Sequence, residues 1–72
     1  MKPGERIAPL SPREREVLTH IASGMPNKKI ARALGVSPNT VKFHLQSIFD
    51  KLSARTRAEA VATAIRRGDL AI

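Results

Sequence analysis

The chain has 72 residues, a length that permits one domain. Hydrophobic residues make up 42% of the sequence and aromatics only 3%, so its core has to be built from Leu, Ile, Val and Ala. Cysteine is absent, which excludes disulfides and cysteine-ligated metals. Most of the net charge of +7 lies between residues 25 and 55, where six Lys or Arg stand against one acid. Such a concentration favours a polyanionic partner: nucleic acid first, then acidic membrane or protein.

No stretch is apolar for long enough to span a bilayer, and no apolar run follows Met1 as in a secretory signal. We therefore expect a cytoplasmic protein with no membrane partner. Residues 1–9 contain two prolines and a glycine and show no helical periodicity, which predicts a linker. Residues 10–72 form the predicted domain.

The domain is predicted to be all-α, a compact four-helix unit. The first helix, 12–23, follows a capping box made of Ser11 and Glu14, with Pro12 at its first position. The second helix covers 27–34 and ends at Gly35.

The third helix is predicted to cover 38–52, after the cap signal Ser37-Pro38. Apolar residues recur in it at steps of three and four, which predicts one buried stripe: Val41, Leu45, Ile48 and Leu52. The fourth helix, 57–67, follows a second capping box formed by Thr56 and Glu59 and ends at Gly68. We expect it to bury Ala60, Val61, Ala64 and Ile65.

Helices 27–34 and 38–52 are separated only by Gly35-Val36-Ser37, a turn typical of a helix-turn-helix and equally of an ordinary helical corner. The outward face of the third helix favours DNA. Asn39, Lys42 and Gln46 lie in one row, and these side chains pair with adenine and guanine edges in the major groove. Phe43, beside them, either packs on a thymine methyl group or is partly buried at the helix edge.

Several residues are suited to phosphate contacts. Thr40 carries a hydroxyl next to the free amides of the first turn of the third helix. Asn27, Lys28 and Lys29 open the second helix and offer amides and positive charge. Arg32 and Lys51 fit solvated surface charge better.

These residues resemble the DNA-binding domain of the LuxR/FixJ/NarL (GerE-like) family of bacterial transcription regulators. The matching stretches are LSPREREVL (10–18), NKKIARALGVSPNTVKFHL (27–45), SIFDKL (47–52) and RAEAVATAIRRGDL (57–70). The resemblance implies a third helix in the major groove of double-stranded DNA and a dimer formed through the fourth helix. It also implies an output domain of a response-regulator or quorum-sensing type of protein. The full-length protein would carry an N-terminal receiver or sensor domain and have RNA polymerase as a further partner.

By the same resemblance, Lys42 is the main base contact, and Phe43 and Gln46 occupy positions that tune sequence preference. Thr40 is a phosphate contact and Val41 is core. His44 is structural with a phosphate bond, and Pro38 joins the phosphate contacts. On the fourth helix, the outward residues suited to a dimer interface are Ala62, Thr63 and Arg66.

The sequence departs from the family pattern at the start of the second helix. Pro26 and Lys29 stand where members usually have Ser or Thr and Glu, so a capping box is lost. Asn27 would take over as the cap, or the helix start would be looser. Lys29 also places positive charge near the expected phosphate path, which predicts stronger nonspecific binding to DNA.

Two alternatives belong to other functional classes. Region 4 of a bacterial sigma factor also contains a glycine-turned helix-turn-helix, although the segment 41–52 and the capped fourth helix fit it less well. A basic helical module that binds an acidic protein is the second. An enzyme is not expected, because the sequence contains no acid/base constellation, metal-ligand cluster or phosphate-binding glycine loop, and no cofactor is expected either.

Overall fold

The computed structural model describes residues 9–71, and its four helices are α1 (Pro12–Ala22), α2 (Asn27–Leu34), α3 (Pro38–Leu52) and α4 (Arg57–Arg67). No strand occurs within this range, so the predicted all-α class is confirmed. The bounds agree with those expected from the sequence to within one residue. Residues 1–8, and with them nearly all of the predicted linker, lie outside the described residues.

Side-chain caps fix where three of the helices begin. Ser11 and Glu14 form both bonds of the predicted capping box, with Glu14 N–H donating to Ser11 Oγ at 3.1 Å and Ser11 N–H donating to Glu14 Oε1 at 2.8 Å. Thr56 is different, because only one bond forms there, from Glu59 N–H to Thr56 Oγ1 at 3.1 Å. The prediction of a complete second box was therefore wrong. Ser37 caps α3 by accepting from Thr40 N–H at 3.1 Å.

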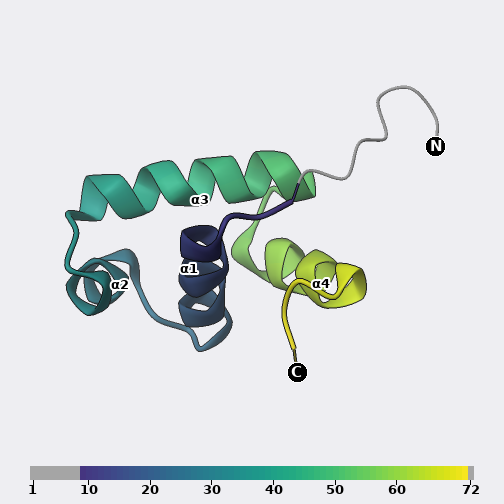
Figure 1. Cartoon of the computed structure of the whole chain (residues 1–72), viewed down its shortest axis with the longest axis horizontal. Helices are drawn as coiled ribbons and strands as arrows, with labels where there is room; N and C mark the ends of the chain where they lie inside the picture. Colours follow the sequence, from purple (N-terminus) through teal and green to yellow (C-terminus); the bar gives the residue numbers. More distant parts are fainter. Residues whose placement is uncertain (1–8, 72) are drawn as a thin grey trace.

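The core lies beneath α3, which runs along one side of the domain across the other helices (Figure 1). Its predicted stripe is buried, together with apolar residues of the other three helices; these are Val17, Leu18, Ile21, Ile30, Ala31, Ala60 and Ala64. Val61 and Ile65 of α4 are only half-buried, contrary to expectation, because they line an open groove between α4 and α1. No helix between residues 9 and 71 is long and apolar enough to cross a membrane.

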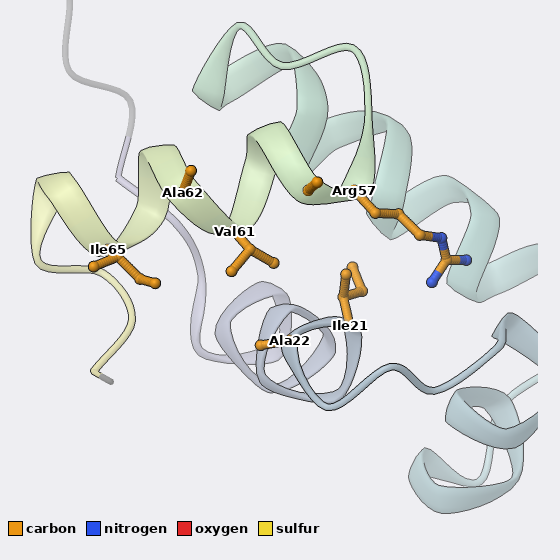
Figure 2. A pocket seen from close by; sticks show the side chains of 7 residues that line it. Ile21, Ala22, Arg57, Val61, Ala62 and Ile65 are labelled. Carbon is orange, nitrogen blue, oxygen red and sulfur yellow. The ribbon is translucent and has the colours of Figure 1, made fainter.

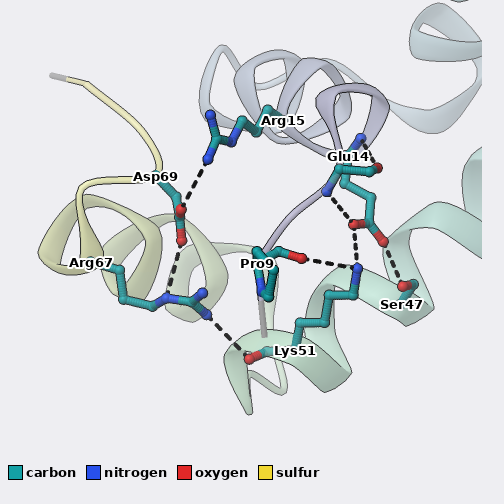
Figure 3. Close-up of polar contacts among 8 residues, drawn as sticks. Pro9, Glu14, Arg15, Ser47, Lys51, Arg67 and Asp69 are labelled. Carbon is teal, nitrogen blue, oxygen red and sulfur yellow. Dashed lines mark hydrogen bonds and ion pairs between the residues drawn. The ribbon is translucent and has the colours of Figure 1, made fainter. Parts of the chain in front are cut away.

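Glu14 is the buried charged residue of the described chain, and it ties α1 to α3 (Figure 3). Its carboxylate accepts from Lys51 Nζ at 2.7 Å and from Ser47 Oγ at 2.5 Å, while Lys51 also donates to the Pro9 carbonyl at 3.2 Å. Lys51 is therefore a structural partner and not the solvated surface charge that the sequence suggested.

These contacts control the ionisation of Glu14. Burial raises the pKa of the carboxyl, but the bonds from Lys51, the Ser11 backbone and Ser47, together with the Lys51 charge, lower it more. The net result is a pKa lowered from 4.5 to about 2. The ionised carboxylate is thus part of the folded structure at neutral pH.

A second ionic contact joins the ends of three helices (Figure 3). Arg67 Nε lies 3.0 Å from Asp69 Oδ2, and Arg15 of α1 lies 3.8 Å from Asp69 Oδ1. Arg67 Nη1 also donates to the Lys51 carbonyl at 3.2 Å, which satisfies a backbone acceptor in the last turn of α3. The C-terminal ends of α3 and α4 are thereby held together.

Acid should destabilise the domain through Glu14. Because the folded-state pKa is depressed, its contribution is fully present above about pH 4.5 and is lost as the pH falls toward about 2. We expect Glu14→Gln to lower the free energy of unfolding at pH 7 by about 1.5–3 kcal/mol and to flatten its pH dependence in that window. Urea unfolding followed by circular dichroism at several pH values measures both effects. Glu16→Gln, an exposed neighbour on α1, is the control, and equal acid dependence of the two variants would contradict the assignment.

Candidate nucleic-acid interface

The turn between α2 and α3 sets the angle of the two helices. Gly35 has a φ of 69°, in the left-handed region that glycine adopts at little cost. Val36 N–H donates back to the Ala31 carbonyl at 2.9 Å, which closes the last turn of α2. Ala31 itself is only 3% exposed, so a small side chain lies inside this corner. The arrangement is a helix-turn-helix with α3 as its second helix.

The four predicted base-contact residues lie together on the outer face of α3. Asn39, Lys42, Phe43 and Gln46 are all exposed and line one surface hollow of about 320 Å³. Phe43 is 74% exposed and is the large hydrophobic residue left uncovered within the described range. The alternative of partial burial at the helix edge is therefore wrong.

The predicted phosphate contacts of α3 differ in how exposed they are. Pro38 is exposed, whereas Thr40 and His44 are half-buried. Thr40 Oγ1 lies 3.0 Å from Ser37 Oγ, so this hydroxyl takes part in the cap of the helix as well. Asn39 N–H, in the same first turn, has no partner within residues 9–71 and remains available as a donor.

The start of α2 has no side-chain cap. Pro26 occupies the N-cap position without such a bond, and Asn27 is the first helical residue, so the expectation that Asn27 caps the helix was wrong. Lys28 and Lys29 are exposed in this first turn. Positive charge at a helix N-terminus opposes the helix dipole, so these lysines do not help to stabilise α2.

Arg57, the first residue of α4, binds the segment that leads into α2. Its Nη1 donates to the Met25 carbonyl at 3.1 Å, and its Nη2 donates to Asn27 Oδ1. Sequence reasoning missed this residue, because Arg57 lies 30 residues from Asn27 and 32 from Met25, and no local pattern connects it to them.

The three residues expected at a dimer interface are neighbours on α4, where Ala62 and Arg66 are exposed and Thr63 is half-buried. Ala62 is exposed and lines the groove between α1 and α4, a depression of about 400 Å³ (Figure 2). Arg66 is exposed and donates to Thr63 Oγ1 at 3.1 Å, so these two side chains are paired with each other along α4. Exposed Ala58 lies with Ala62 in the groove and extends the apolar part of this surface. Within residues 9–71, no group of three or more His, Cys, Asp or Glu could hold a metal ion.

Comparison with known proteins connects this geometry to a family. The model of the bacterial regulatory proteins of the luxR family matches residues 8–64. The chain is 48% identical over 67 residues to the probable transcriptional regulatory protein NarL of Mycobacterium tuberculosis, an alignment that covers 88% of this chain and 31% of the relative. It is 40% identical over 65 residues to the transcriptional regulatory protein FixJ of Bradyrhizobium diazoefficiens, with 90% and 32% covered.

Solved structures agree with this match. The transcription factor GerE superposes with a TM-score of 0.81 at 31% identity, covering 86% of this chain and 92% of that one. The response regulator ChrA of a heme-sensing two-component system superposes with a TM-score of 0.84 at 36% identity, covering 96% of this chain and 33% of that one.

The chain therefore belongs to the luxR family of bacterial regulatory proteins, and it is a DNA-binding helix-turn-helix domain of transcription regulators. This confirms the fold and the family predicted from the sequence, decides against a sigma-factor region, and agrees with the expectation that the domain is not an enzyme. The chain spans about a third of the length of NarL and FixJ.

Lys29→Glu should have opposite effects on folding and on DNA binding. A carboxylate in the first turn of α2 favours the helix dipole, so the free energy of unfolding should rise by about 0.3–1 kcal/mol. Nonspecific affinity for duplex DNA should fall, and the slope of log K against log salt should become shallower by about 1 or more. Fluorescence anisotropy at several salt concentrations measures this, and Lys29→Gln should give an intermediate result. An unchanged slope would mean that Lys29 does not lie near phosphate.

Proposed function

We propose that this domain is the output domain of a cytoplasmic transcription regulator and binds specific sequences of double-stranded DNA through α3 in the major groove. The observation that carries the proposal is the common exposure of the four side chains around one hollow on α3. The opposite face of the same helix is buried in the core. The major groove is about 12 Å wide and admits one α-helix, so this outer face is suited to enter it.

The four side chains match three kinds of base edge. Lys42 donates to guanine O6 and N7, and the amides of Asn39 and Gln46 form paired bonds with adenine N6 and N7. Phe43 has no hydrogen-bonding group, and the apolar group on a base edge in this groove is the thymine methyl. Its high exposure supports a contact of this kind, because a large uncovered apolar side chain on a polar face marks an interaction site.

Phosphates on either side of the groove would be bound by the starts of two helices. Lys28 and Lys29 of α2 supply charge, and Asn27 supplies an amide. On α3, the first turn supplies a free N–H group and the Thr40 hydroxyl, with Pro38 and His44 at the edge of the contact. These contacts would position α3 without contributing sequence preference.

We further propose that two copies bind half-sites about 34 Å apart, one turn of DNA, and pair through α4. Ala62, with Thr63 and Arg66 beside it, would lie at this interface. One support is a structural neighbour described as a dimer, the Vibrio cholerae receptor VqmA, which matches with a TM-score of 0.80 at 28% identity. A receiver or sensor domain would precede this domain in the full-length protein, as suits the likeness to the response regulator ChrA.

Lys42→Ala should reduce the affinity for a duplex selected from a random library by about 1–3 kcal/mol and relax the preference at one base pair. Thr40→Val should instead weaken binding to all sequences alike, because it removes a phosphate donor. Anisotropy titrations against the selected duplex and its single-base variants measure both effects. If Lys42→Ala kept the preferred site and its affinity, the proposed register of α3 in the groove would be wrong.

Ala62→Glu should disrupt pairing on DNA without changing the contacts of a single copy. Linking two binding events through one interface raises the affinity for adjacent sites by about a hundredfold or more. The variant should lose this gain on a duplex with two half-sites and bind a duplex with one half-site as the wild type does. Gel-shift titrations on both duplexes test this, with the exposed Glu59→Gln on the same helix as the control. Unchanged cooperativity would place the dimer interface elsewhere.

A further inference from the structure

Asn27 forms a side-chain bond with a residue far away in the sequence, and this bond determines how its amide is oriented. Arg57 carries only hydrogen-bond donors, so the atom of Asn27 that faces it has to be the acceptor Oδ1. The other end of the same amide is Nδ2, a group that can only donate. The chemistry of the pair therefore fixes the polarity of the Asn27 side chain.

The donor end of this amide is unused within the domain. Asn27 Nδ2 has no hydrogen-bond partner among residues 9–71, and it does not occur among their buried unpaired side-chain atoms. Asn27 is half-buried, while its neighbours Lys28 and Lys29 are exposed. A donor beside two positive charges is suited to a phosphate oxygen, whereas the acceptor end of the same amide would repel one.

Arg57 is itself held in place. Its second nitrogen, Nη1, donates to the Met25 carbonyl at 3.1 Å, so the guanidinium spans the segment just before α2. Its side chain also lines the groove between α1 and α4 and extends from there toward this segment (Figure 2). α2 lacks a side-chain cap at Pro26, and the two bonds from Arg57 attach the residue before Pro26 and the first residue of α2 to α4.

We propose that Arg57 is a positioning residue for phosphate recognition: by binding Asn27 Oδ1 it turns Asn27 Nδ2 outward as a donor to a DNA phosphate. Arg57 itself does not touch the DNA in this arrangement. The inference rests on the proposed function, since it assigns a phosphate to the start of α2. It also connects α4, the helix proposed to form the dimer, to one of the DNA contacts of the same copy.

Two substitutions of Asn27 separate this role from a purely structural one. Asn27→Asp keeps an acceptor for Arg57, now as an ion pair, and places a negative charge in the first turn of α2, so thermal stability should be equal or higher. It removes the outward donor, so affinity for duplex DNA of arbitrary sequence should fall by tenfold or more. Asn27→Ala should lower the affinity by about tenfold, the value of one hydrogen bond to a charged group. If both variants bind as tightly as the wild type, the proposal is overturned.

The role of Arg57 is tested by a double-mutant cycle on the 72-residue chain. Arg57→Met keeps the apolar stem in the groove and removes both bonds, and Arg55→Met removes the same charge from an exposed neighbour that makes no such contact. In the Arg57→Met background, Asn27→Ala should lower the affinity for duplex DNA by clearly less than tenfold. In the Arg55→Met background, it should lower this affinity by the full tenfold. If the affinity losses of the single variants simply added up in both double variants, Arg57 would act through its charge alone, and the proposal would be overturned.

Two further comparisons separate this inference from a folding defect and from a failure of the proposed function. If Arg57→Met fails to fold, as judged by circular dichroism, the Asn27→Asp comparison decides, because that variant preserves the pair: full DNA affinity overturns the proposal, and lost affinity with intact stability supports it. A wild-type chain that showed no preference for any selected duplex would refute the proposed function. Retained wild-type preference with unaffected Asn27 variants would refute this inference alone.

Discussion

The burial of one face of α3 is the constraint on which the rest of the domain depends. Without disulfides and with only two aromatic residues, stability has to come from aliphatic side chains, each contributing about 1.5–3 kcal/mol when fully buried. The stripe from Val41 to Leu52 lies against buried residues from all three other helices. Rotation of α3 about its axis would expose that stripe, so the opposite face, with Lys42 and Phe43, is held toward solvent.

The two ends of α3 have different tasks. Near its C-terminus, Ser47 and Lys51 bind the buried carboxylate of Glu14, and the Lys51 carbonyl accepts from Arg67. Toward its N-terminus, the side chains of Asn39, Lys42 and Gln46 are exposed and the first turn has a free backbone donor. Polar groups are thus used for internal anchoring at one end of the helix and remain available to a ligand at the other. Because α3 is held at one end and packed along one face, its exposed side would lose little conformational entropy on binding DNA.

The sequence predicted the helices well because their boundaries are marked by local chemistry. A Ser or Thr cap, a proline in the first turn and a glycine after the last turn act within a few residues, so they can be recognised without tertiary structure. Two errors concerning α4 have a common cause. Val61 and Ile65 are apolar at helical spacing, yet α1 covers them only in part, and Thr56 forms one bond of its box where two were expected. The burial of Val61 and Ile65 and the bonds at Thr56 both depend on how α4 packs against its neighbours, and the sequence of α4 alone does not show this.

The sequence by itself therefore determined the class of fold and the four side chains on the outer face of α3, because periodicity and spacing place residues on a helix surface. The family followed from the resemblance of the sequence stretches to known members. Only the tertiary structure decided that Phe43 is uncovered, that Lys51 pairs with Glu14 across 37 residues, and that Arg57 takes the acceptor of Asn27 across 30. Such contacts depend on how the helices pack against one another, and no local pattern encodes the partner of a charged side chain. The face of α3 that is proposed to contact DNA follows from the chain's own periodicity, while the way α2 is held beside it follows from the packing of α4.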